Sequence, residues 1–179
     1  MTTKTLPTKS LTSENWLLPD SEGLTTIKVF NEGEARELNA DDWLKLCQSA
    51  ELHLKVPRNV RQHFEAARGA LAYGYFFCPL YTLAIEQLFR AAECAVIQKC
   101  KETNGRVIDF KGKPIDYYQA LAWLRKINFI SRDDFHQWDS IRKFRPHPTT
   151  QKDQPLAIPP GIVANHLKFV AERINGLFH

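Results

Sequence analysis

The chain has 179 residues, of which 44% are hydrophobic and 25% charged, as is typical of a globular domain with its own core. No apolar run approaches the roughly 20 residues that a membrane helix needs, and the first residues lack the apolar segment of a signal peptide. A cytoplasmic protein without membrane contact is therefore expected. The four cysteines form no C-x-x-C pair and no zinc spacing with the histidines, which argues against a metal site.

The net charge of +4 is unevenly distributed along the chain. Residues 1–56 carry six Lys and Arg against nine Asp and Glu, whereas residues 57–179 carry eighteen against eleven. The larger part is basic, which favours a polyanionic partner. The alternative is that the charge has no partner, because mildly basic domains are common.

The N-terminal part predicts little regular structure before its first helix. Residues 1–14 are rich in Thr, Ser and Lys and predict a mobile arm. Alternating apolar and polar residues around an Asn-Glu-Gly turn predict a short β-hairpin across 25–38. Asn39 and the acids that follow it predict a helix that runs to about Leu54. We assign residues 1–56 to an N-terminal part made of the arm, the hairpin and this helix.

The remainder of the chain predicts helices throughout. Apolar residues recur at steps of three and four, which is the spacing of an amphipathic helix. The second of these segments is apolar around more than half its circumference and is expected to be central. The fold class is therefore all-α, a bundle of five or so helices over 57–179. The predicted helices cover about 57–77, 79–103, 116–129, 131–144 and 158–177.

The segment W-D-S-I-R-K-F-R-P-H-P, residues 138–148, combines three cations with a histidine between two prolines. Arg142 and His147 stand five positions apart, which is about 140° on a continuous helix, so they would not share a face. Pro146 removes a backbone donor and pushes Arg145 toward an extended conformation. The helix is expected to stop near Arg145, so that the His147 ring can swing back toward Arg142.

An imidazole and a guanidinium that face one space suit phosphodiester chemistry. His147 can exchange a proton with a ribose 2′-OH or with the leaving oxygen, and Arg142 can stabilise charge on the phosphoryl oxygens, with no metal required. The alternative is structural, because a histidine and cations at a helix C-terminus already interact favourably with the helix dipole. Of the other histidines, His136 has a candidate structural partner in Asp139. No P-loop, dinucleotide or H-E-x-x-H motif is present, so no cofactor is expected.

The R-x4-H motif of Arg142 and His147, late in a basic all-helical chain and just before a final amphipathic helix, resembles the HEPN superfamily (higher eukaryote and prokaryote nucleotide-binding domains). The resemblance covers about Arg58 to Phe178. It implies a metal-independent endoribonuclease that acts as a homodimer, with two motifs sharing one RNA cleft. In that case Arg142 binds the scissile phosphate, His147 is the acid and base, and Glu86 is the polar residue on the facing helix.

The resemblance also implies a biological class, namely a toxin, a phage-defence protein or a part of RNA-processing machinery. In such systems an antitoxin or a nucleotidyltransferase is the protein partner. Two positions depart from the family pattern. Lys143 follows the arginine where active members commonly carry Asn, Asp or His, and Pro146 lies inside the motif. Lys143 and Arg145 would then hold a phosphate backbone, with or without cutting it. The alternative function is a non-catalytic HEPN-like helical module that binds a protein or nucleic-acid partner.

Overall fold

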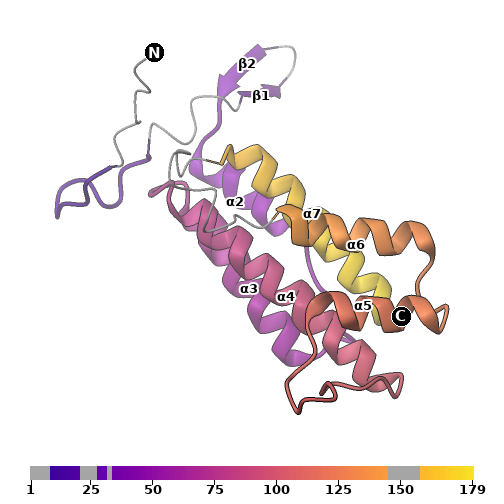
Figure 1. Ribbon diagram of the computed structural model, residues 1–179. Helices are drawn as coiled ribbons and strands as arrows, with labels where there is room; N and C mark the ends of the chain where they lie inside the picture. The colour runs from indigo at the N-terminus through magenta and orange to yellow at the C-terminus, as the bar shows by residue number, and fades with distance from the viewer. Residues whose placement is uncertain (1–8, 21–27, 32–33, 145–157) are drawn as a thin grey trace, which may run out of the picture.

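The computed structural model describes residues 9–20, 28–31, 34–144 and 158–179 (Figure 1). Within these ranges it contains six helices and one antiparallel hairpin, which confirms the predicted all-α class, and both strands fall inside the predicted hairpin range. The elements are β1 (Lys28–Asn31), β2 (Glu34–Glu37), α2 (Ala40–Gln48), α3 (Arg58–Tyr73), α4 (Leu80–Glu102), α5 (Tyr117–Lys126), α6 (Arg132–Phe144) and α7 (Pro160–Leu177).

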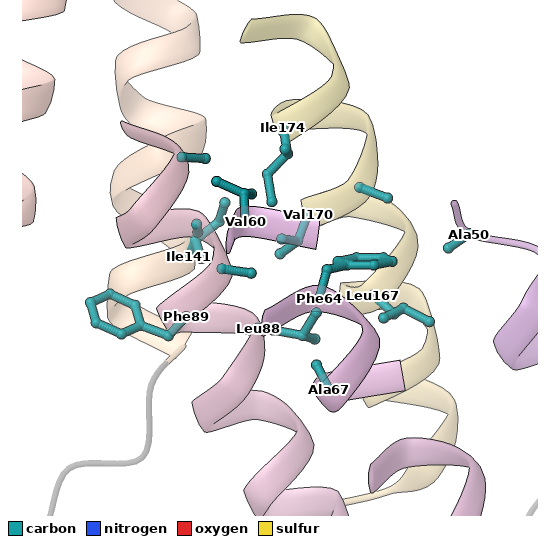
Figure 2. Packing of buried hydrophobic residues seen from close by; sticks show 14 of the residues in the cluster. Ala50, Val60, Phe64, Ala67, Leu88, Phe89, Ile141, Leu167, Val170 and Ile174 are labelled. Atoms are coloured by element: carbon teal, nitrogen blue, oxygen red, sulfur yellow. The ribbon is translucent and has the colours of Figure 1, made fainter. Parts of the chain in front are cut away.

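Helix α4 is the centre of the bundle, as its apolar circumference predicts, and it packs against α3, α5, α6 and α7. Figure 2 shows Leu88 of α4 beside Phe64 of α3 and Leu167 of α7, all of them fully buried. Burying each of these side chains contributes about 1.5–3 kcal/mol to the free energy of unfolding. The buried residues of α4 are Tyr81, Ala84, Ile85, Leu88, Phe89, Ala91, Ala92, Ala95, Val96 and Cys100.

Helix α2 shares this core. It packs against α3 and α7, and its Trp43 is buried against the ring of Tyr81, with the two ring centroids 5.8 Å apart. The Trp43 indole N–H donates to the carbonyl of Leu71 near the end of α3 at 3.0 Å, which satisfies the one polar atom that the indole buries. Asn39 and Asp42 form a reciprocal capping box at the start of α2, as the sequence predicts.

Of the predicted mobile arm, residues 1–14, the structure describes residues 9–14, and the first eight residues lie outside the described ranges, so the mobility of the arm stays a prediction. The Lys9 ammonium donates to the carbonyl of Phe76, just after α3, at 3.0 Å. Further along, the buried carboxylate of Asp20 accepts a hydrogen bond from the backbone N–H of Cys78 at 2.9 Å. An acceptor there is favoured because the N–H groups at a helix start lack partners within the helix. Two long-range anchors therefore hold residues 9–20 against the α3–α4 corner.

Three helices end earlier than predicted. Helix α2 ends at Gln48 and not near Leu54. Helix α3 ends at Tyr73, and the chain turns at Gly74, where the Tyr81 ring leaves no room for a Cβ atom. Helix α5 ends at Lys126, because Asn128 takes the left-handed conformation with φ of 56° that closes many helices. In α3 and α5 the backbone turns before the apolar pattern of the sequence ends.

The close approach at Gly74 yields a stability prediction. We expect Gly74→Ala to lower the free energy of unfolding by about 1–3 kcal/mol, because the new methyl group would overlap the buried Tyr81 ring. Gly69→Ala in the same helix is the matched control, since a Cβ there meets nothing within 4 Å. That control should raise the free energy by about 0.5–1 kcal/mol through helix propensity. Urea denaturation measures both, and equal effects would show that the turn is not tightly packed.

Candidate functional site

Helix α6 carries the cationic segment and is fixed at both ends. Ser131 and Asp134 form a reciprocal cap at its start, with the Asp134 N–H donating to Ser131 Oγ at 3.0 Å. Trp138 and Ile141 are buried against the core. Because these two apolar residues face inward, the last turn of α6 presents its cations on the side that remains open. The described part of the helix reaches Phe144, and the predicted stop near Arg145 lies outside the described residues.

Asp139 organises this last turn. Arg142 Nε donates to Asp139 Oδ1 at 2.9 Å, and Arg142 Nη2 forms an ion pair with the same oxygen, also at 2.9 Å. The ammonium of Lys143 lies 2.7 Å from Oδ2. The Asp139 side chain is 11% exposed, whereas those of Arg142 and Lys143 are 44% and 68% exposed. A nearly buried carboxylate therefore orients two cations whose outer surfaces face solvent. The remaining Arg142 N–H groups on that surface suit an anion.

The charge state of the cluster follows from these contacts. The hydrogen bond from Lys143 and then that from Arg142 hold the pKa of Asp139 below its usual range, against the opposing effect of its burial. Asp139 is thus a carboxylate at neutral pH, and the three side chains carry one net positive charge. This arrangement fits a phosphate monoanion better than a more highly charged group.

Tyr117, the first residue of α5, contacts both α6 next to the cluster and α4. Its buried hydroxyl donates to the Trp138 carbonyl at 2.8 Å, next to Asp139 in the chain, and its ring lies 5.4 Å from that of Phe89 on α4. Burial and the neighbouring Asp139 charge raise the pKa of Tyr117, so the hydroxyl stays protonated and keeps its hydrogen bond. Through these contacts Tyr117 links α4, α5 and α6 next to Asp139.

The structure brings together part of the predicted site. Arg142 and Lys143 lie side by side on Asp139, and Glu86 lies half-buried on α4, the helix against which α6 packs. Arg145 and His147 lie outside the described residues, so the meeting of His147 with Arg142 stays a prediction.

The predicted pairing of His136 with Asp139 is wrong. Asp139 takes Arg142 and Lys143 instead, three and four residues later, while His136 is exposed with its ring against Phe135. An acid followed by cations at those two spacings is the ordinary pattern of helical ion pairs, so the sequence does contain the signal for Asp139.

A second histidine meets the end of α6. His166 on α7 stacks on Phe144, the last residue of α6, with ring centroids 4.3 Å apart, and on Phe169 at 6.2 Å. Burial lowers the pKa of His166 to about 4, so its ring is neutral at pH 7. The sequence alone predicts no partner for this residue, because Phe144 and His166 are 22 positions apart in the chain. A neutral ring between two aromatic rings is a packing element of the α6–α7 junction.

One surface depression lies away from the Asp139 cluster. A groove of about 400 Å³ between α3 and α4 is lined by Asn59, His63, Arg90, Glu93 and Cys94, among others. The Asn59 amide donates to the Cys94 sulfur at 3.1 Å, and burial together with Glu93 raises the pKa of that thiol, which therefore stays protonated. A protonated thiol is a poor nucleophile, so the groove does not offer cysteine chemistry.

Comparison with known proteins gave no match to a protein-family model, to a curated protein or to a solved structure. In the part of the chain that the structure describes, no three His, Cys, Asp or Glu side chains come together as a metal site. None of the helices described is both long enough and apolar enough to span a membrane. Further conclusions rest on the chemistry of the residues themselves.

The Asp139 cluster yields a pH-dependent prediction. Because its pKa is lowered in the folded state, Asp139 stabilises the fold above its unfolded pKa of about 3.9 and loses this contribution as pH falls through the folded value. We expect Asp139→Asn to lower the free energy of unfolding by about 1–2 kcal/mol at pH 7, and the difference from the wild type to shrink as pH falls below about 3.9. Asp133→Asn, an exposed acid of α6, is the control. Equal effects of the two at pH 7 would contradict the role of Asp139.

His166 predicts a different pH window. Its folded pKa of about 4 lies below its usual value of about 6.5, so the folded state binds fewer protons than the unfolded chain between these values. Stability should therefore fall as pH drops from 6.5 to 4, and His166→Phe should remove that part of the decline while keeping the ring stack. Thermal unfolding across pH 4–7 measures it. Parallel curves for wild type and His166→Phe would contradict the burial of this ring.

Proposed function

We propose that this chain is a HEPN-like RNA-binding protein that cleaves RNA without a metal and acts as a homodimer. The observation that carries the proposal is the Arg142 guanidinium, held by Asp139 and half exposed at the end of α6, five residues before His147. The basic charge of residues 57–179 and the all-helical fold support it. A preorganised guanidinium is the group that best stabilises charge on a phosphoryl oxygen.

In the proposed reaction the ribose 2′-OH attacks the adjacent phosphorus and the 5′ oxygen of the next nucleotide leaves. His147 takes the proton of the hydroxyl or gives one to the leaving oxygen, and Arg142 binds the non-bridging oxygens. Asp139 is a positioning residue, because it fixes the guanidinium without touching the substrate. Lys143 and Arg145 hold neighbouring phosphates. In a homodimer two such motifs share the cleft, with Glu86 contributed from the facing helix.

One observation favours the alternative, a non-catalytic helical interaction module in which the same residues only stabilise the helix end. Asp139 pairs with Lys143 as well as with Arg142, so the carboxylate offsets one of the two charges. Cations near a helix C-terminus also stabilise it by about 0.3–1 kcal/mol, which gives them a use without any ligand. The two functions differ in whether RNA is cut, and experiment separates them.

The test is cleavage of an RNA with single-stranded and structured regions by the purified protein in EDTA. We expect the wild type to cut, and Arg142→Ala and His147→Ala each to reduce the rate by a hundredfold or more. Arg132→Ala and His136→Ala are matched controls, because both residues are exposed on the same helix. These substitutions also remove one arginine and one histidine side chain, as the test variants do. These controls should cut at the wild-type rate.

Two outcomes would count against the proposal. A wild type that binds RNA but never cuts it would support the interaction module. Cutting that survives both Arg142→Ala and His147→Ala would place the activity at another site or in a contaminant. A dimerisation measurement by light scattering accompanies each variant, so that loss of the dimer is not mistaken for loss of chemistry.

A further inference from the structure

The connection between α4 and α5 forms a braced finger, here defined as residues 106–115. Ile108 and Pro114 form an antiparallel bridge, the Asp109 N–H donates to the Lys113 carbonyl at 2.7 Å, and the Ile115 N–H donates to the Val107 carbonyl at 3.0 Å. In Figure 1 the finger lies at the end of the bundle opposite the β1–β2 hairpin. A connection with its own backbone pairing presents its side chains in a fixed way.

Asp109 stiffens the tip. Its Oδ1 accepts hydrogen bonds from the backbone N–H groups of Lys111 and Lys113 at 2.8 and 2.9 Å. Gly112 takes a φ of 75°, which closes the turn and which residues with a side chain rarely adopt. The carboxylate is therefore directed at the backbone of the turn, while the three cations of the finger, Arg106, Lys111 and Lys113, are exposed and outnumber this one acid.

The root of the finger is equally fixed. The Gly105 N–H donates to the Cys100 carbonyl at 2.7 Å, and a Cβ at Gly105 would collide with the Cys100 sulfur and the Trp123 indole. The Trp123 indole N–H donates to Thr103 Oγ1 at 3.2 Å, which joins α5 to the end of α4. The finger thus stands on the packed junction of two core helices.

At the tip Phe110 is 94% exposed. Exposing a phenylalanine forgoes about 1.5–3 kcal/mol of burial free energy, so a braced turn that presents one calls for an explanation. The Arg106 guanidinium lies 5.0 Å from the centre of the ring, and Lys111 and Lys113 are exposed beside it. An aromatic ring among three cations is the combination that stacks an unpaired base and binds its phosphates.

We infer that the finger binds single-stranded RNA, with Phe110 stacked on an unpaired base and Arg106, Lys111 and Lys113 on the adjacent phosphates. The inference rests on the proposed function for the identity of the ligand and does not require cleavage. The ring and cations also resemble a membrane-surface contact, but insertion into lipid needs a broad apolar face, and Phe110 is joined here by Ile108 alone.

The finger and the Asp139 cluster are joined through α5. Tyr117 follows Phe110 by seven residues, and its hydroxyl binds the Trp138 carbonyl beside Asp139. Seven residues span at most about 25 Å, so one strand of RNA can reach both places. The finger would select unpaired RNA and hold it, and the segment after α6 would act on it.

The test is equilibrium binding of a fluorescent single-stranded oligonucleotide with 2′-O-methyl groups, which cannot be cut by attack of a 2′-OH. We expect Phe110→Ala and Phe110→Leu to weaken binding about tenfold, since both lack a ring, and Phe110→Trp to retain it. Trp16→Ala, which removes an exposed ring of the N-terminal segment, should bind like the wild type. The double variant Lys111→Ala, Lys113→Ala should reduce the slope of log affinity against log salt by about 1.4.

The outcomes separate this inference from the nuclease proposal. Phe110→Ala that binds like the wild type overturns the finger, whatever the cleavage assay shows. Binding that requires the ring, without any cleavage, supports the finger and counts against the nuclease. Tight binding to phosphatidylserine vesicles that Phe110→Leu preserves, with no preference for the oligonucleotide, would assign the finger to a membrane surface instead. Circular dichroism of each variant checks folding, which the exposure of these side chains should leave unchanged.

Discussion

The bundle depends on covering α4. Its buried residues occupy most of its circumference, so no single neighbour can remove it from water, and α3, α5, α6 and α7 each cover a part. This requirement places the candidate site. The burial of Trp138 and Ile141 fixes helix α6 on the core and thereby sets the position of its polar last turn. The cations at the end of α6 therefore stand on a rigid support, as a site that orients a phosphate requires.

Asp139 connects this support to chemistry. Its carboxylate is nearly buried and pairs with two cations, and the Tyr117 hydroxyl donates to the carbonyl of the preceding residue, Trp138. A guanidinium fixed in this way loses little side-chain entropy when it binds an anion. Tyr117 is also the first residue of α5, the helix that follows the finger. The cationic last turn of α6 and the exposed Phe110 ring are therefore connected through α5. Together they form the surface that we propose for an unpaired, negatively charged strand.

Much of this could be predicted from sequence, because helix periodicity and capping residues are local signals. The central role of α4 and the caps of α2 and α6 follow from such patterns. Contacts between distant segments could not be predicted. The apolar period of α3 runs past Gly74, and only the position of the Tyr81 ring explains the turn there. The anchoring of Asp20 on Cys78 joins residues 58 positions apart. The spacing of Asp139 to Arg142 and Lys143 is also a local signal, although the prediction paired Asp139 with His136.

The central claim is that Arg142 and His147 meet on one phosphate, and side-chain NMR tests it most directly. Protein labelled with ¹⁵N would be titrated with an RNA whose 2′-OH at the cutting position is blocked. If the account is correct, the Arg142 Nε–H and the His147 ring signals shift together and saturate at the same RNA concentration. An Arg142 signal that remains at its Asp139-bonded position while RNA binds, or a His147 ring that does not respond, would contradict it.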